Sequence, residues 1–428
     1  MELGEHGKAN FTWNMIGSIC ESALNFVLLI VVNRIIGEAG GGVFTLAFSH
    51  AQLMYYLATL EVRPIQSTDV KQKYRFADYF SLRMVSCAGM IAASLGYVLI
   101  MNGDPFKRRI MMYMCLYKAI EAVLDLFASM FQQHDRIEYS GKVSTFRVVL
   151  ILTTFTATLL ATKNLEIASL VMIAMGLVTL LTYNLSKWRT FDDVPIQLQF
   201  GYAKEILIAS FPLFVSVFVM LYISNAPKYA IDRFCSDVIQ NRYSILFMPA
   251  FVINLFSQFV LRPMLTPMAR IWNDGQVWNF RRNLLKMMAG IAAVTLLGIG
   301  GAWLLGIPIL KLLYGADLSG DRSVLIWVMV YGGLNAMNIF LYDMIAVTRN
   351  QRKLLAAYGI AAVLVFFLAP VLVQRYEMTG AIWASILSLG SLDVMLVFIM
   401  NRVLSRKAAE GQAVKIDNAG AETEEKTR

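Results

Sequence analysis

Runs of about twenty apolar residues recur along this chain, and they decide most of what it can fold into. A hydrocarbon core about 30 Å thick is crossed by a helix of about 20 residues. The composition agrees, because 57% of the 428 residues are hydrophobic and only 16% are charged. Soluble domains have about 45–50% apolar and about 25% charged residues. The sequence therefore predicts an integral membrane protein whose outer surface faces lipid.

The apolar runs predict about twelve transmembrane helices and an all-α membrane protein. We expect no signal peptide before the first span, because its apolar run is too long for one. The expected spans are 11–36, 42–62, 78–101, 110–134, 143–162, 165–187, 203–226, 240–262, 283–306, 323–347, 353–373 and 379–402.

The predicted connections divide the chain into two six-helix halves around a central cavity. The halves are 1–187 and 203–405, the cytoplasmic linker between them is 188–202, and the tail 406–428 is expected to be disordered. A weak internal echo supports the halves, since Arg34 and Arg233 occupy equivalent places between the first two spans of each. Parallel repeats of this kind are typical of transporters with a binding site between the halves.

The distribution of positive charge predicts that both termini lie in the cytoplasm. With that orientation, the inside loops and the start of the tail hold twenty lysines and arginines, and the outside loops hold eleven. The cluster Lys107–Arg109 does not follow this bias. Because the net charge of +9 is spread over short loops, it favours contact with anionic lipid and gives no reason to expect nucleic acid as a partner.

Motifs of enzyme chemistry are missing from the sequence. The four cysteines are far apart in sequence, which excludes local CxxC metal or redox motifs, and no HExxH, GxSxG or P-loop pattern stands out. The expected outside loops are too short to hold a sugar donor or a growing glycan chain. We therefore expect a protein that moves a substrate, with no catalytic residues, no metal site and no cofactor.

Polar side chains follow one face of several expected spans. A charge at the membrane centre costs about 2.5–3.5 kcal/mol on insertion scales, so such residues normally face a cavity or a partner. Their spacing of three or four residues places each set on one helix face. The sets are Asn14, Ser18, Glu21 and Asn25; Lys118, Glu121 and Asp125; Asn225, Lys228 and Asp232; Asn254, Gln258 and Arg262; and Tyr331, Asn335, Asn338 and Tyr342. Together they favour a water-filled, charged cavity.

Each set also has a simpler interpretation that the sequence leaves open. Lys118 and Glu121 can form an internal ion pair, which leaves Asp125 over. Arg262 can extend its side chain to the membrane interface, and Pro227 either breaks a helix beside a cavity or marks an ordinary helix end. His50, in the middle of the span 42–62, can carry a proton or make a packing hydrogen bond, and packing is favoured.

Three segments carry a family resemblance. At Glu61-Val-Arg-Pro-Ile-Gln66, Lys118-Ala-Ile-Glu-Ala-Val-Leu-Asp125 and Ser224-Asn-Ala-Pro-Lys-Tyr-Ala-Ile-Asp232, the sequence resembles bacterial polysaccharide flippases of the O-antigen (Wzx) type. These belong to the multidrug/oligosaccharidyl-lipid/polysaccharide (MOP) exporter superfamily. The resemblance covers about residues 10–405, and the layout of twelve spans in two halves is also similar to that superfamily.

The resemblance implies a carrier of the bacterial plasma membrane. Its substrate would be an undecaprenyl-pyrophosphate-linked oligosaccharide, turned from the inner to the outer leaflet by alternating access. Its other partners would be membrane lipids and the polysaccharide assembly machinery, including that of lipopolysaccharide. A drug or metabolite exporter of the same superfamily is the alternative, and a membrane enzyme of glycan assembly is a more distant one.

The polar sets supply roles for such a carrier. Cations for the pyrophosphate would be Lys118, Lys228 and Arg262. Sugar hydroxyls would bond to Asn14, Asn25, Asn335 and Asn338. The coupling ion, H⁺ or Na⁺, would bind to Glu21, Glu121 and Asp125. Asn225 and Asp232 complete the expected cavity lining.

Overall fold

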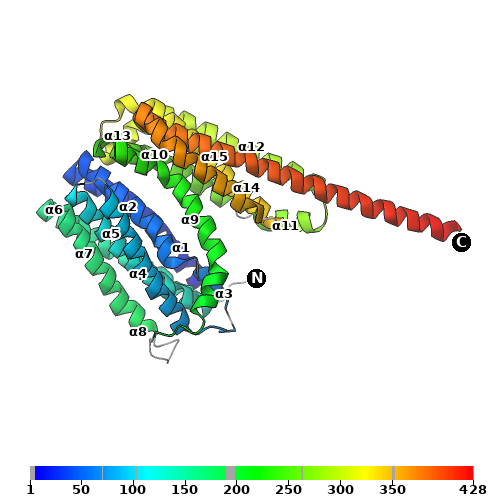
Figure 1. Cartoon of the computed structure of the whole chain (residues 1–428), viewed down its shortest axis with the longest axis horizontal. Helices are drawn as coiled ribbons and strands as arrows, with labels where there is room; N and C mark the ends of the chain where they lie inside the picture. Colours follow the sequence, from blue (N-terminus) through cyan, green and yellow to red (C-terminus); the bar gives the residue numbers. More distant parts are fainter. Residues whose placement is uncertain are drawn as a thin grey trace. The chain divides into compact units, whose positions relative to one another are not determined.

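The computed structural model describes residues 5–69, 71–101, 104–188, 198–261, 264–348 and 352–427. Throughout these residues the regular structure is helical and no strand occurs, which confirms the predicted all-α class (Figure 1). Eight segments of this described part are long and apolar enough to cross a membrane. One of them contains two of the expected spans, and α2 (Glu38–Thr59), α5 (Pro105–Gln133) and α10 (Asp237–Leu261) hold the other three.

The helices gather into two compact units. Unit 1 comprises Met1–Ile245 with Lys311–Asp317, and unit 2 comprises Leu246–Leu310 with Leu318–Arg428. The boundary between the two units falls within α10. Helix α9 and the first part of α10 belong to unit 1 because they pack with N-terminal helices. The predicted halves 1–187 and 203–405 describe topology and stay a prediction.

Unit 1 consists of long helices that run side by side (Figure 1). Besides α2, α5 and the start of α10, its helices are α1 (Glu5–Ile36), α3 (Arg63–Thr68), α4 (Phe76–Ile100), α6 (Ile137–Thr162), α7 (Leu165–Thr179), a π-helical turn (Leu180–Asn184), α8 (Leu185–Trp188) and α9 (Ala203–Phe234). Local sequence sets several of these ends. Pro105 occupies the first turn of α5, and the Asn164 side chain accepts hydrogen bonds from the first backbone N–H groups of α7.

Helices α2 and α5 lie in the interior of unit 1. Helix α2 contacts α1, α4, α5 and α9, and α5 contacts α2, α3, α4, α6 and α7. Because other helices surround them, these two helices need not be apolar on every face, which explains their lower hydropathy. The charged side chains of α5 therefore meet protein groups.

Helices α1 and α6 touch backbone to backbone at a pair of glycines. A Cβ atom added to Gly141 would lie 2.1 Å from the carbonyl oxygen of Trp13, and one added to Gly17 would lie 2.8 Å from that of Gly141. Small residues allow such close approach between membrane helices. This contact fixes α6, and with it the charged residues that α6 carries.

We expect Gly141→Ala to lower the free energy of unfolding by about 1–3 kcal/mol, since a methyl group there overpacks a backbone contact. The measurement is thermal unfolding of the purified protein in detergent. Gly89→Ala, in α4 with nothing within 4 Å of its added Cβ, is the control and should leave stability unchanged or raise it by about 0.5–1 kcal/mol. Equal effects from both substitutions would contradict the expected overpacking.

Unit 2 contains the rest of α10 followed by helices from the C-terminal part of the chain. These are α11 (Leu265–Asn273), α12 (Val277–Gly301), a π-helical turn (Ala302–Gly306), the first residues of α13 (Ile307–Tyr314), a 3₁₀ turn (Ser319–Asp321), α14 (Arg322–Val347) and α15 (Arg352–Thr427). Helix α15 contains a non-helical residue, Glu377, with φ 48°, so its two parts carry the expected spans 353–373 and 379–402.

The end of α15 differs from the expected disordered tail. Residues 406–427 continue the helix. Alanine, glutamate and lysine are strong helix formers, and this stretch contains no proline. A polar composition argues against packing into a core, but it does not by itself prevent a helix from continuing.

Candidate functional site

The centre of unit 1 holds a group of paired charges on α1, α5 and α6. The Lys118 ammonium forms an ion pair with the Glu121 carboxylate one turn further along α5. Arg147 of α6 lies 2.9 Å from Glu121 and 2.8 Å from Glu21 of α1. The set therefore has two carboxylates and two cations. The simpler interpretation of Lys118 and Glu121, an internal ion pair, describes what the structure shows.

Arg147 joins the three helices and is almost completely enclosed. Its side chain is 4% exposed. The Ser144 hydroxyl, one turn earlier on α6, also donates to Glu21 at 2.6 Å. An enclosed arginine requires opposite charge because isolated burial of a charge is very unfavourable. Arg147 thus holds α1, α5 and α6 together by electrostatics.

Lys118 also lies against aromatic rings. Its ammonium group is 4.8 Å from the centre of the Phe48 ring and 5.6 Å from that of Tyr55, both on α2. Cation–π attraction at such distances adds to the ion pair with Glu121. With a carboxylate and two rings already around it, Lys118 is less available for a phosphate group than its sequence position suggests.

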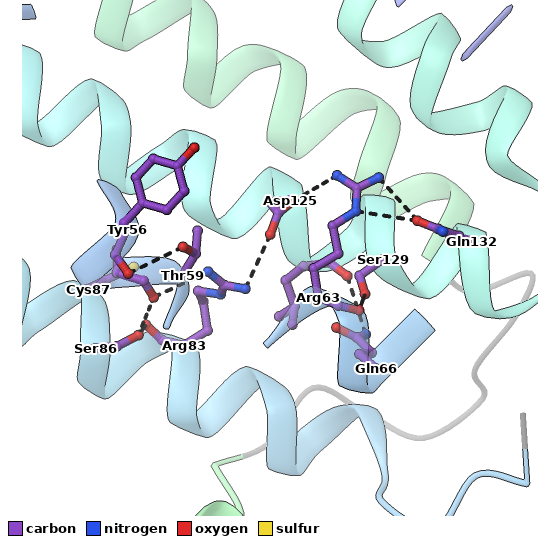
Figure 2. Close-up of polar contacts among 12 residues, drawn as sticks. Tyr56, Thr59, Arg63, Gln66, Arg83, Ser86, Cys87, Asp125, Ser129 and Gln132 are labelled. Atoms are coloured by element: carbon purple, nitrogen blue, oxygen red, sulfur yellow. Dashed lines mark hydrogen bonds and ion pairs between the residues drawn. The ribbon is translucent and has the colours of Figure 1, made fainter. Parts of the chain in front are cut away.

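Asp125, one turn further along α5 than Glu121, is shared by two arginines (Figure 2). Its carboxylate oxygens lie 2.9 Å from Arg63 of α3 and 3.4 Å from Arg83 of α4. Arg83 also donates to the carbonyl oxygen of Ala58 at the end of α2, at 3.2 Å. The acid that the spacing left over therefore has its partners on two other helices.

The same cluster fastens the short helix α3 to α5 (Figure 2). Arg63 donates to Gln132 at 3.3 Å, the Gln66 amide donates to the Leu126 carbonyl at 3.4 Å, and the Ser129 hydroxyl donates to the Arg63 carbonyl at 3.4 Å. Two of the three segments that carry the family resemblance meet here. Their contacts explain why these residue types occur together, and the role they indicate is structural.

The cluster Lys107–Arg109, which did not follow the bias of positive charge toward the inside loops, lies at the start of α5. Its lysine meets an acid near the end of α9. Lys107 lies 2.8 Å from Asp232 and 2.5 Å from Asp237. Its neighbour Arg109 pairs with Glu166 at 2.6 Å. Burial alone lowers the pKa of Lys107, but hydrogen bonds to the two carboxylates outweigh burial and raise that pKa above its ordinary value. Asp232, an expected cavity residue, is thus a structural partner of Lys107.

Lys228 of α9 differs from Lys118, Glu121 and Asp125, which all form ion pairs. Its ammonium group donates to the Ser49 hydroxyl of α2 at 2.8 Å. No carboxylate in the described part of the chain forms an ion pair with it, and its side chain is only partly buried. Helix α9 continues past the neighbouring Pro227 to Phe234, so Lys228 is held on a regular helix.

Aromatic residues follow both Lys228 and its partner Ser49 in the sequence. The ring of His50, 1% exposed, stacks on Tyr97 with ring centres 4.6 Å apart and lies edge-on to Tyr229. The His50 Nδ1 atom is 3.3 Å from the Tyr229 hydroxyl. These contacts join α2, α4 and α9 and describe a packing role for His50, while its Nε2 atom has no protein partner among the described residues.

The remaining predicted residues are spread over both units. In unit 1, Asn14 is exposed, Asn25 is partly buried, and Asn225 donates to the Leu221 carbonyl of its own helix at 2.9 Å. In unit 2, Asn335 is partly buried and Asn338 is buried beside Asp393. The predicted residue Arg262 lies outside the described residues, as do the side chains of Asn254 and Gln258.

Three residues that organise the site, Arg83, Arg147 and Ser49, are not among the residues predicted from sequence to line it. Arg83 and Arg147 both lie inside expected spans, where their charge was a usable signal. Ser49 carried no such signal, because a serine in a membrane helix usually bonds to its own backbone. Within the described residues no cluster of three or more His, Cys, Asp or Glu side chains is arranged to hold a metal ion.

No protein-family profile and no curated protein matches the sequence, but the fold has solved counterparts. A lipid II flippase, MurJ, in an inward closed conformation is 11% identical and has a TM-score of 0.69, with 94% of this chain and 90% of that chain covered. An inward-facing multidrug resistance MATE family transporter of the MOP superfamily is 14% identical, with a TM-score of 0.68 and coverage of 91% and 95%. A MOP superfamily transporter from Pyrococcus furiosus is 15% identical, with a TM-score of 0.56 and coverage of 95% and 97%.

These similarities define a class by its fold. The chain has the multi-pass, all-α fold of MOP superfamily transporters along almost its whole length. Because sequence identity is low, fold alone does not determine substrate.

Proposed function

We propose that this protein is a flippase that moves a lipid-linked oligosaccharide across the membrane by alternating access. The observation that carries the proposal is Lys228, a cation within a transmembrane helix that has only a serine hydroxyl as its partner in the described structure. Such a group is unfavourable in a membrane unless an anion joins it. A pyrophosphate between the lipid and the sugar supplies that anion.

The paired charges elsewhere in unit 1 strengthen the preference for an anionic substrate. In unit 1, Glu21, Glu121 and Asp125 each contact at least one arginine or lysine. The negative charge of these three carboxylates is therefore matched within the protein. The positive charge of Lys228 is not. The similarity to a lipid II flippase supports a lipid-linked substrate, and the resemblance of the sequence motifs to O-antigen flippases narrows it to an undecaprenyl-pyrophosphate-linked repeat unit.

The remaining features of the proposal come from topology and composition. Both termini lie in the cytoplasm of a bacterial cell, and the substrate moves from the inner to the outer leaflet of the plasma membrane. The asparagines Asn14, Asn25 and Asn335 provide hydrogen bonds for sugar hydroxyls. A partner that assembles the polysaccharide receives the glycan on the outer side, and the protein itself makes or breaks no covalent bond.

A cation-coupled exporter of small molecules is the second candidate. The MATE transporter matches this fold about as well as the lipid II flippase does, with TM-scores of 0.68 and 0.69. A cationic drug would need an unmatched carboxylate in the binding region. Glu21, Glu121 and Asp125 of unit 1 are each matched by a cation, whereas the amine of Lys228 is not, so these charges favour the anionic substrate.

The decisive experiment places the lipid-linked oligosaccharide in one leaflet or the other. We expect deletion of the gene to leave this material facing the cytoplasm and its return to restore outward-facing glycan. A membrane-impermeant lectin applied to spheroplasts and to inside-out vesicles reports the leaflet. Normal outward-facing glycan in the deleted strain, with no second flippase present, together with new sensitivity to cationic drugs, would support the exporter instead.

A further inference from the structure

Unit 2 contains a carboxylate that is buried without a cation. Asp393, in the second part of α15, is 7% exposed. One of its oxygens, Oδ1, accepts a hydrogen bond from the Asn338 amide at 3.2 Å. The other, Oδ2, is buried and has no protein partner among the described residues. No lysine or arginine of the described chain forms an ion pair with Asp393.

The hydrogen bonds beside Asp393 form a chain across three helical segments. The Tyr358 hydroxyl, from the first part of α15, donates to the Asn338 side-chain oxygen at 2.8 Å. Asn338, from α14, then donates its amide to Asp393. Because the side-chain oxygen of Asn338 accepts the hydrogen bond from Tyr358, the NH₂ group of Asn338 faces the Asp393 carboxyl group. This arrangement supports one oxygen of Asp393 and leaves the other without a donor.

The other titratable groups around this chain supply no positive charge. The Tyr342 ring of α14 lies edge-on to Tyr358, with ring centres 6.2 Å apart. Asp343, the next residue on α14, is a second acid. The charged groups of α12, the other helix that packs on α15, are Arg281, Arg282 and Lys286 in its first turns, and none of them forms an ion pair with Asp393. An ionised Asp393 would therefore be an unbalanced negative charge in an apolar span.

From this geometry we propose that Asp393, supported by Asn338 and Tyr358, is a proton-binding site. A buried carboxyl group without a cation is stable when it is protonated, because protonation removes its charge. The site binds one proton on Oδ2 from water and releases it to water when the surroundings become hydrated. Its use as the coupling site for transport rests on the proposed function, whereas the bound proton itself does not.

The charge pairing in unit 1 directs the coupling role toward unit 2. The sequence assigned the coupling ion to Glu21, Glu121 and Asp125. Each of these carboxylates already contacts an arginine, and an ion pair stabilises the ionised form. A proton added to any of them would have to break that ion pair, whereas a proton on Asp393 breaks no ion pair.

Infrared spectroscopy of the purified full chain tests the bound proton directly. At neutral pH, we expect the wild-type protein to show the C=O stretching band of a protonated carboxylic acid, and Asp393→Asn to lose the equivalent of one such group per molecule. Asparagine has the shape of the neutral acid, so the fold should persist. Asp317→Asn is the matched control, because Asp317 is exposed and lies 3.6 Å from Lys311; it should leave the band unchanged.

Two results would overturn the proton site: an identical band in the wild-type protein and Asp393→Asn, or a band that disappears when Na⁺ replaces K⁺. The second result would indicate a sodium site. In the leaflet assay, Asp393→Asn should translocate glycan at a rate that no longer responds to a pH gradient. If the band is lost as expected but the wild-type protein moves no glycan, the proton site stands and the proposed function fails.

Discussion

Lys228→Ala should reduce the rate at which lipid-linked oligosaccharide reaches the outer leaflet by roughly ten- to hundredfold. The reason is the loss of a charge-assisted contact with the substrate phosphate, worth about 1.5–3 kcal/mol, and each 1.4 kcal/mol corresponds to about a factor of ten. The measurement is the rate of lectin labelling in spheroplasts that express equal amounts of each variant.

Lys228→Arg should retain most of the activity because it keeps the positive charge. Lys204→Ala, on the same helix but exposed, is the matched control and should translocate as the wild-type protein does. We also expect Lys228→Ala to unfold no earlier than the wild-type protein, since the lost amine has no ion-pair partner in the described structure. A variant that translocates normally, or that fails only because it unfolds, would contradict a role in substrate binding.

Arg147→Met should be the most destabilising substitution in unit 1. Removal of one partner from a buried ion pair costs about 3–5 kcal/mol, because it leaves uncompensated charge behind. Here the buried Glu121 would keep Lys118 as a partner, while Glu21 would lose its only cation among the described residues. Because the Glu21 side chain is 46% exposed, we expect a loss at the lower end of this range. Thermal unfolding in detergent and the amount of protein in the membrane would both report the loss.

The double variant Arg147→Met with Glu21→Gln distinguishes charge from packing. It restores neutrality, since Lys118 and Glu121 remain as a pair, so we expect it to be more stable than Arg147→Met alone. The difference between the double variant and the sum of the single variants measures the coupling of the two residues. Effects that simply add would show that the charges of Arg147 and Glu21 are not coupled.

The spans were predictable because hydrocarbon thickness imposes one length on every crossing helix. Composition indicated a lipid-facing protein, and each expected span falls on a helix of the described structure. The tail after the last span differs from the prediction. Helix α15 continues through residues expected to be disordered, because propensity along a helix and burial in a core are separate requirements.

The sequence predicted which helix face each charged residue occupies better than it predicted the ion-pair partner of that residue. Spacing placed Lys118, Glu121 and Asp125 on one side of α5, as the helical period requires. Which helices lie opposite that side depends on packing between segments far apart in sequence. Arg147 is 26 residues after Glu121, and Arg63 is 62 residues before Asp125, so no periodicity connects them. The prediction that Asp125 faces a cavity therefore did not include Arg63 and Arg83, which form ion pairs with it.

The unmatched amine of Lys228 has an electrical consequence. A unit charge that crosses the whole membrane field gains or loses about 2.3 kcal/mol per 100 mV. Any step that moves Lys228 through part of this field therefore depends on the membrane potential when the carrier is empty. Under the proposed function, a bound anionic head group would bring opposite charge to the same place, so the loaded and empty carriers would respond differently to voltage. The resting potential of the cell would then favour one direction of the return step over the other.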